Sequence, residues 1–374
     1  MPSASSRDIS IDMIKGLGCL CIILAHLPIF TLTLPQNLII QLAGPGTVFF
    51  FSTAGITAAI QVRRYPAKSL LLYFGVLSIL GSCWNIMVHG DIKAFASVEI
   101  FQIITLGSAL ICWLERNGPS SQKTLLLLSC LFGGFKYVSQ AIFPDFDGGG
   151  WLLVANDYIP YHDPDNLGKR SFPGFPIFPW ISVFPLGLFC YRATKQQNAI
   201  GMILMVITAV VSTYLGSNPI EKWDTSVAFL AHCYTYIFLS FWLFNGGRTK
   251  TNRIGNLFSW TGKNSLTFFF FHPLALLGGL IVYNFSNLYV AWFCAAILAY
   301  FVTKGAIKLK PWKIFSSAWS WVILGLILFS MPIMDTLIDT PTTGGISRLV
   351  AFIVGMVLCI NVPKLAELTK KAVS

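Results

Sequence analysis

Long apolar stretches separated by short polar segments follow one another along the whole chain. Twelve of these stretches are long enough, or nearly so, to cross a bilayer as a helix, which takes about 20 residues. They cover residues 13–31, 38–60, 68–88, 98–114, 124–143, 174–191, 199–216, 226–245, 264–284, 288–303, 315–334 and 346–361. The pattern predicts an all-α fold, a polytopic transmembrane helical bundle of about twelve spans.

The basic residues test this count, because cytoplasmic loops of membrane proteins carry an excess of Lys and Arg. With a cytoplasmic N-terminus, 20 of the 26 basic residues fall in segments assigned to the inside. Eleven of the fifteen acidic residues fall outside or at the outer edge. The distribution predicts that both termini are cytoplasmic, and it explains the net charge of +11 without a nucleic-acid partner.

Composition supports a chain whose main partner is the lipid bilayer. Hydrophobic residues make up 55% and charged residues 11% of the 374 positions, whereas soluble domains carry about 25% charged residues. No polar block is long enough to be a separate soluble domain, so residues 1–374 are predicted to form one membrane domain. One long loop, about residues 144–173, is expected to be ordered over the outer mouth.

Ionisable residues interrupt the first apolar stretch, where a charge at membrane depth indicates a functional site. The eleven steps from Lys15 to His26 turn a helix by about 1100°, so the two share a face, with Asp12 one turn earlier. Gly16 and Gly18 beside them allow another chain or a ligand to approach closely. The alternative is that Lys15 extends to the lipid headgroups and His26 hydrogen-bonds a neighbouring helix.

Two later segments carry further candidates. The prolines around Trp180 predict an irregular or kinked helix entry beside a cavity, because such backbone is tolerated at membrane depth only where protein or water satisfies it. A basic loop, 248–263, is expected to lead to Asn264, which could cap the next helix. His272 lies about two turns into that helix beside Pro273, and its functional and structural interpretations both stay open.

Five short motifs carry a resemblance to a known family. Residues 7–18, Arg-Asp-Ile-Ser-Ile-Asp-Met-Ile-Lys-Gly-Leu-Gly, resemble the start of the heparan-α-glucosaminide N-acetyltransferase catalytic-domain family of bacterial membrane proteins. Blocks at 49–59, 101–107, 175–187 and 262–266 follow in that family's order. Acyltransferase type 3 sugar O-acetylases are also similar, since a basic residue precedes a histidine by ten intervening residues. Lys15 stands where arginine is commoner, and an ammonium binds phosphate without the bidentate fork.

The resemblance implies a multi-spanning acyltransferase of the bacterial cytoplasmic (inner) membrane. It would move an acetyl group from cytosolic acetyl-CoA, a co-substrate, to an extracytoplasmic sugar amine or hydroxyl, with no permanently bound cofactor and no metal. His26 is then the first candidate for the base or acyl acceptor and His272 the second, while Asp12 orients or neutralises Lys15. The expected CoA-binding residues are Lys15, Arg63, Arg64, Lys263, Asn264 and Ser265, and the expected acceptor-binding residues are Gln102, Asp157, His162 and Trp180.

Two other functions fit parts of the pattern. A transporter of a small polar or anionic solute commonly has twelve helices with both ends inside, although no matching pair of broken helices marks the two halves here. A non-enzymatic assembly partner would bind neither CoA nor sugar. The acceptor, N- against O-acylation, the acyl length and the oligomeric state, a homodimer included, stay open.

Overall fold

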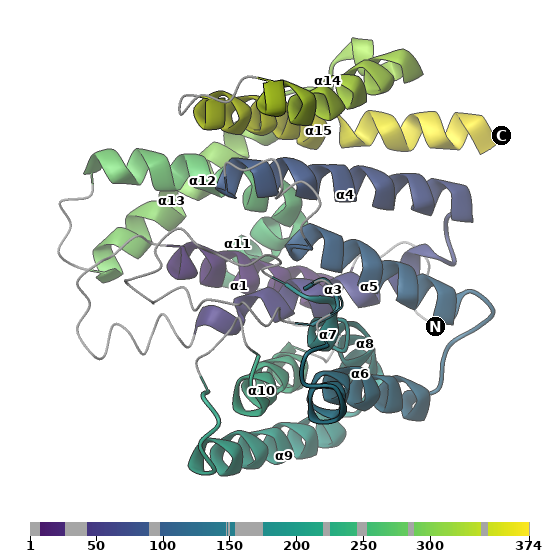
Figure 1. Cartoon of the computed structure of the whole chain (residues 1–374), viewed down its shortest axis with the longest axis vertical. Helices are drawn as coiled ribbons and strands as arrows, with labels where there is room; N and C mark the ends of the chain where they lie inside the picture. The colour runs from purple at the N-terminus through teal and green to yellow at the C-terminus, as the bar shows by residue number, and fades with distance from the viewer. Residues whose placement is uncertain are drawn as a thin grey trace. The chain divides into compact units, whose positions relative to one another are not determined.

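The computed structural model describes residues 8–26, 43–89, 98–146, 148, 150–153, 175–219, 225–244, 253–282, 288–337 and 343–373. Every regular element in these ranges is an α-helix or a short 3₁₀-helix, so the all-α prediction is confirmed for them (Figure 1). The chain divides into two compact units. The first comprises Met1–Thr57, Ser120–Gly133 and Ser182–Gly305, and the second comprises Ala58–Pro119, Gly134–Ile181 and Ala306–Ser374.

In the first unit, α1 (Ile9–Ala25) is the helix on which other elements converge. It packs most extensively against α11 (Arg253–Lys263) and also contacts η1 (Gly44–Gly46), α10 (Val227–Phe244) and α12 (Ser265–Val282). α10 in turn packs against α8 (Val183–Arg192) and α9 (Lys195–Tyr214). Most of α3 (Thr47–Gln61), the start of α6 (Gln122–Ile142) and nearly all of α13 (Leu288–Lys308) complete the unit.

In the second unit, α15 (Thr343–Val373) is the central helix. It packs against α4 (Ala67–His89), against α14 (Ala318–Leu337) and against the short η4 (Lys313–Ser316). Figure 1 shows α14, α15 and α4 lying side by side in that order. α5 (Ile100–Glu115) packs against α4, and α7 (Ile177–Trp180) belongs to the same unit.

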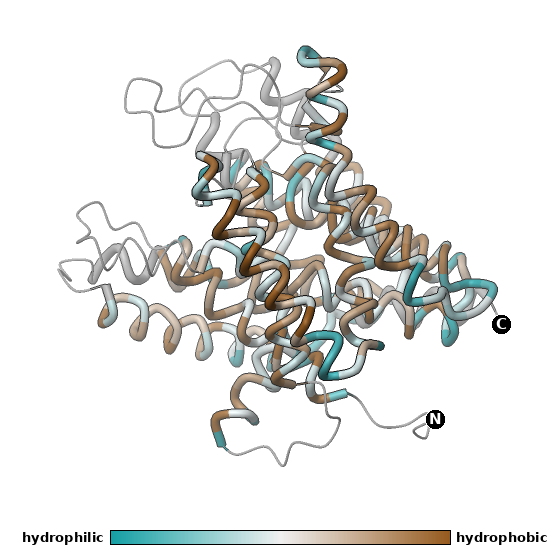
Figure 2. Tube along the Cα trace, turned by 90° about the horizontal axis from the view of Figure 1, so that it is seen from below, coloured by the Kyte–Doolittle hydropathy of each residue, from teal (hydrophilic) through white to brown (hydrophobic). Residues whose placement is uncertain are grey.

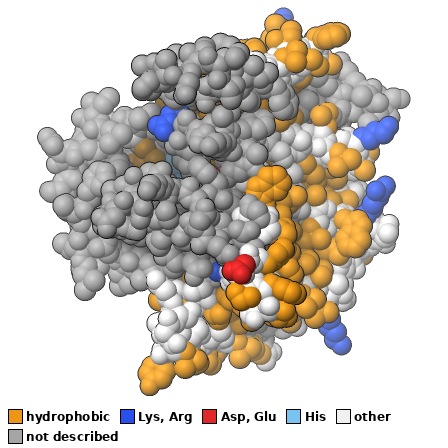
Figure 3. Space-filling view, viewed as in Figure 1, with side chains coloured by type: hydrophobic (Ala, Val, Ile, Leu, Met, Phe, Trp, Pro, Cys, Tyr) orange, Lys and Arg blue, Asp and Glu red, His pale blue; other side chains and the backbone are white. Residues whose placement is uncertain are grey.

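Five helices in the described part of the chain are long and apolar enough to cross a membrane. They cover Ala67–Met87, Gln122–Ile142, Lys195–Tyr214, Val227–Phe244 and Tyr289–Lys308. Figure 2 shows long hydrophobic segments in the described helices, and Figure 3 shows many hydrophobic side chains on the described part of the face in view. Helix α9 exposes Ile203, Ile207 and Val210, which would face lipid. The protein therefore has the helices of a membrane protein, while twelve spans and cytoplasmic termini stay predictions.

The prolines near Trp180 interrupt their helix as predicted. Phe178, within α7, has φ −102° and ψ 133°, which is not helical, and the turn at Ile181 and Ser182 separates α7 from α8. The backbone there is held by other segments of the second unit, since the Ile177 and Phe178 amides donate to the Trp151 and Leu152 carbonyls. The kink is thus satisfied by protein groups.

The predicted loop at 248–263 is wrong over most of its length, because Arg253–Lys263 forms α11. The segment is too polar to be recognised as a span, but two of its glycines, Gly255 and Gly262, are buried. A small face buried against α1 stabilises a helix whose own hydropathy would not have predicted it. Most of the predicted outer loop, with Asp157, His162 and Asp163, lies outside the described residues.

Candidate functional site

Helix α1 begins at a well-formed cap. The Asp8 carboxylate accepts a hydrogen bond from the Ser10 amide at 2.9 Å, and its other oxygen accepts one from the Tyr191 hydroxyl at 2.8 Å. A carboxylate at this end also interacts favourably with the helix dipole. The cap and its contact with α8 fix where α1 starts, and hence which directions Asp12 and Lys15 face.

Two glycines allow α1 and α11 to touch backbone to backbone. A Cβ added at Gly262 would lie 1.7 Å from the Asp12 carbonyl oxygen, and one added at Gly16 would lie 2.1 Å from the Phe258 carbonyl oxygen. No larger residue fits at either position without moving the helices apart. Gly18, on another side of α1, approaches the Phe50 ring in the same way. The close approach predicted for Gly16 and Gly18 is therefore confirmed, and Asp12 beside the crossing is only 4% exposed.

The Lys15 ammonium is directed toward α3. Its Nζ donates a hydrogen bond to the Thr57 hydroxyl at 3.2 Å, and the Thr57 hydroxyl donates to the Thr53 carbonyl at 2.8 Å. Lys15 itself is half-buried. A helix other than its own thus positions the cation. Thr57 was not among the residues singled out from sequence, and the only signal was a threonine spaced four residues after another in an apolar run.

Between Lys15 and His26, the shared face of α1 is covered by protein. Cys19 and Ile22, which continue the stripe, are both buried. The two candidate side chains therefore stand at opposite ends of an inward-facing strip of α1, about 16 Å apart along the helix axis.

His26 meets His272 at the other end of this strip. His26 directly follows α1, and its amide donates to the Ile22 carbonyl at 3.1 Å. The ring centroids of His26 and His272 are 5.3 Å apart, with an interplanar angle of 37°. His26 is exposed and His272, on α12, is 1% exposed. The structure thus brings together the two histidines that the sequence had nominated from separate motifs.

Both rings place the same nitrogen against a backbone carbonyl. His26 Nδ1 lies 2.9 Å from the Ile22 oxygen, and His272 Nδ1 lies 2.5 Å from the Phe269 oxygen. A carbonyl oxygen can only accept, so each Nδ1 carries the hydrogen in these contacts. The lone pair is then on Nε2 in both neutral imidazoles, which makes Nε2 the basic and nucleophilic atom.

The candidates at the junction of α11 and α12 have separate surroundings. Lys263 is exposed at the last residue of α11, and Ser265 is half-buried at the first residue of α12. The Asn264 amide Nδ2 donates to the Trp260 carbonyl at 2.8 Å. This side-chain bond closes the preceding helix, and the cap of α12 by Asn264 stays a prediction.

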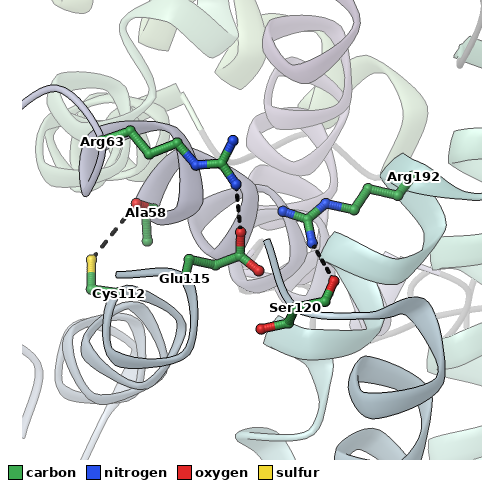
Figure 4. A network of polar contacts seen from close by, with 6 residues as sticks. All are labelled: Ala58, Arg63, Cys112, Glu115, Ser120 and Arg192. Carbon is green, nitrogen blue, oxygen red and sulfur yellow. Dashed lines mark hydrogen bonds and ion pairs between the residues drawn. The ribbon is translucent and has the colours of Figure 1, made fainter. Parts of the chain in front are cut away.

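In the second unit, Arg63 is paired with a buried acid. Its Nη2 lies 3.0 Å from Glu115 Oε2, and the side chains are 46% and 0% exposed respectively (Figure 4). Cys112, one turn earlier on α5, donates from Sγ to the Ala58 carbonyl at 3.7 Å. These contacts join the end of α3 to the end of α5. Arg64, its neighbour, is exposed.

Gln102 and Trp180 are also in the second unit, and both have structural contacts. Gln102 Oε1 accepts from the Glu99 amide at 3.2 Å in a capping box at the start of α5. A Cβ added at Gly81 on α4 would lie 2.7 Å from Gln102 Nε2, so α4 approaches this side chain closely. Trp180 is buried, and its ring centroid lies 5.1 Å from that of Phe175.

Figure 4 also shows a contact of the first unit that sequence reasoning missed. Arg192, at the end of α8, donates from Nη1 to the Ser120 carbonyl at 3.0 Å. Its own carbonyl accepts a hydrogen bond from the Gln122 side chain at 2.8 Å. The arginine thereby holds the start of α6 against the end of α8.

Comparisons of this chain with protein-family models, with curated proteins and with solved structures find no match. The resemblance of its short motifs to the acetyltransferase family therefore stays a prediction, and function has to be argued from the site itself.

Proposed function

We propose that this protein is a membrane acyltransferase that moves an acetyl group from acetyl-CoA to a sugar amine or hydroxyl. The observation that carries the proposal is the meeting of His26 and His272 at a centroid distance of 5.3 Å. One imidazole is exposed and can reach an acceptor, and the other is buried directly behind it. Acyl transfer needs such a base beside the receiving atom.

In the proposed reaction, His26 Nε2 takes the proton from the acceptor hydroxyl or amine. The acceptor oxygen or nitrogen forms a bond to the thioester carbonyl carbon, the carbon–sulfur bond breaks, and the CoA thiolate leaves and is protonated. His272 lies close enough to His26 to orient its ring or to relay the proton. In a second route the acetyl group goes first to a histidine Nε2, and mass spectrometry of the protein after rapid quenching would detect that acetylated residue.

Lys15 is the proposed cation for the CoA phosphates. It lies about 16 Å from His26 along one helix, and Thr57 holds it in place. Lys263, in the same unit, is an exposed basic candidate for the same ligand, whereas Arg63 and Arg64 belong to the second unit, where Arg63 pairs with Glu115. In the proposed twelve-span topology, Lys15 is on the cytoplasmic side of a bacterial inner membrane, where acetyl-CoA is available, and His26 lies toward the outer side.

The direct test is release of CoA from acetyl-CoA by the purified protein, supplied with a panel of sugars and amino sugars and followed by chromatography. His26→Ala should lower the rate by about 10²- to 10⁴-fold, because a positioned base contributes that much. The matched control is His232→Ala, since His232 lies on α10 against Tyr236, with ring centroids 5.0 Å apart, and should leave the rate near that of the wild type.

Two outcomes would contradict the enzyme assignment. The first is a folded wild-type protein that releases no CoA with any acceptor, in which case uptake of small anionic solutes into vesicles would favour the transporter. The second is an equal loss in His26→Ala and His232→Ala.

The role of Lys15 has its own test. Lys15→Ala should reduce the thermal stabilisation by CoA far more than the stabilisation by the acceptor sugar. Lys195→Ala, an exposed lysine at the start of α9, is the control and should change neither. Equal weakening of both ligands by Lys15→Ala would contradict the phosphate-binding role.

A further inference from the structure

A groove in the second unit is separate from every candidate catalytic residue of the first. It has a volume of about 230 Å³ and lies between α4, α14 and α15. Its nine lining residues are apolar, among them Leu72 and Val76 on α4, Trp321 and Gly325 on α14, and Leu358 on α15. Since none of them is charged, the interior fits a hydrocarbon chain and not a sugar or nucleotide.

The groove has a buried floor and an open rim. Val76 and Leu358 are buried, whereas Leu72 on α4 is 44% exposed and Val322 on α14 is 47% exposed. The open side thus lies on the apolar outer surface of helices that could sit in a membrane. A chain entering from that surface would reach the floor without crossing a polar layer.

At one end of the groove, the neutral polar groups are already bonded within the protein. The Trp321 indole donates from Nε1 to the Phe315 carbonyl at 2.9 Å, and the Asn361 side-chain oxygen accepts from the Trp312 amide at 2.7 Å. Asn361 also donates to the Val357 carbonyl at 2.8 Å. These bonds hold η4 against α14 and α15. Because these polar groups are already hydrogen-bonded, the polar head of a ligand would have to be bound by charged side chains.

Two exposed lysines belong to elements that border the groove, one to α4 and one to η4. Lys68 lies four residues before Leu72 on the stripe of α4 that continues through Val76 into the groove, so it extends that face outward. Lys313 is the first residue of η4, two positions before the Phe315 that bonds Trp321. Both are exposed, and among the described residues neither has a hydrogen-bonding or ionic partner.

We propose that this groove binds an anionic phospholipid, with part of an acyl chain between α4, α14 and α15 and the phosphate near Lys68 and Lys313. An apolar groove with exposed lysines on the elements that form it is complementary to such a molecule, and basic pockets between membrane helices are suited to lipid phosphates. The site does not depend on the acyltransferase function. It would make the stability of the second unit depend on the lipid composition of the membrane.

The experiment measures thermal unfolding of the purified full chain in neutral detergent as lipid is added. Phosphatidylglycerol and phosphatidylcholine with identical acyl chains are compared, together with the water-soluble headgroup glycerophosphoglycerol. Phosphatidylglycerol should raise the unfolding temperature at lower concentration than phosphatidylcholine, and the headgroup alone should have no effect. The double variant Lys68→Gln/Lys313→Gln should bind phosphatidylglycerol roughly thirtyfold more weakly and keep its response to phosphatidylcholine.

Controls separate the two halves of the proposed site. Lys195→Gln removes an exposed lysine of the first unit and should retain the preference for phosphatidylglycerol. Gly325→Leu fills the groove and should weaken both lipids, and Val322→Trp at the rim serves the same purpose if Gly325→Leu does not fold. Equal stabilisation of the wild type by both lipids, a preference that survives loss of both lysines, or stabilisation by the headgroup alone would each overturn the proposal.

Discussion

Two glycines, Gly262 of the first unit and Gly325 of the second, have opposite effects on packing. At the crossing of α1 and α11, a Cβ at Gly262 would lie 1.7 Å from the Asp12 carbonyl oxygen, whereas a Cβ at Gly325 on α14 would have no heavy atom within 4 Å. The first glycine removes a side chain so that two backbones can touch, and the second leaves space in the wall of a groove. Close contact in the first unit fixes titratable side chains, while the loose contact in the second leaves room for a ligand.

The largest effect should come from closing the tight contact. Gly262→Ala should lower the free energy of unfolding by about 3 kcal/mol, because the added methyl meets backbone atoms that cannot rotate away. The control is Gly305→Ala on α13, where a Cβ meets nothing within 4 Å. Thermal unfolding of both variants in one detergent measures the difference, and equal stability would show that α1 and α11 are not in backbone contact.

A smaller loss of stability is expected when the ion pair between Arg63 and Glu115 in the second unit is broken. Arg63→Gln should destabilise by about 2 kcal/mol, since it removes the cation that faces the buried Glu115 carboxylate. Glu115→Gln should be milder, because half-exposed Arg63 can be solvated by water. Chemical unfolding of the two single variants and the double variant gives the interaction free energy between Arg63 and Glu115. A milder effect of Arg63→Gln than of Glu115→Gln would mean that the buried carboxylate does not need this arginine.

Filling the loose contact should have a small effect of opposite sign. Gly325→Ala is expected to stabilise by about 1 kcal/mol, because alanine is a better helix former and the added methyl enters empty space. Unfolding in lipid-free detergent isolates this gain from any bound lipid. A loss of stability as large as that of Gly262→Ala would remove the contrast between the two glycines.

The smallest effect concerns the hydrogen bond that positions Lys15. Thr57→Val keeps the shape of the side chain and removes the hydroxyl, so stability should fall by only about 0.5 kcal/mol. CoA affinity should fall more clearly, because the ammonium loses its fixed position. Thr57→Ser restores the hydroxyl and should restore binding, and a Thr57→Val protein that binds CoA like the wild type would separate Thr57 from the site.

Local apolar patterning predicted the helices well, since each of the twelve apolar stretches overlaps a described helix. The ionisable residues within these stretches also indicated His26 and His272 as candidates, and the two rings lie together. The apolar patterning failed for α11, because a helix stabilised by burying glycines against another helix has no hydrophobic run to detect. Thr57 was missed for the same reason. The hydrogen bond from Lys15 joins two segments that are distant in the sequence, and the sequence of an apolar helix does not indicate which of its hydroxyl groups will accept a bond from a lysine of another helix.

The backbone crossing at Gly16 and Gly262 holds α1 closely against α11. His26 directly follows α1, whereas His272 is carried by α12, which starts just after Asn264 and also contacts α1. The separation of the two imidazoles therefore depends on how α12 packs against both α1 and α11.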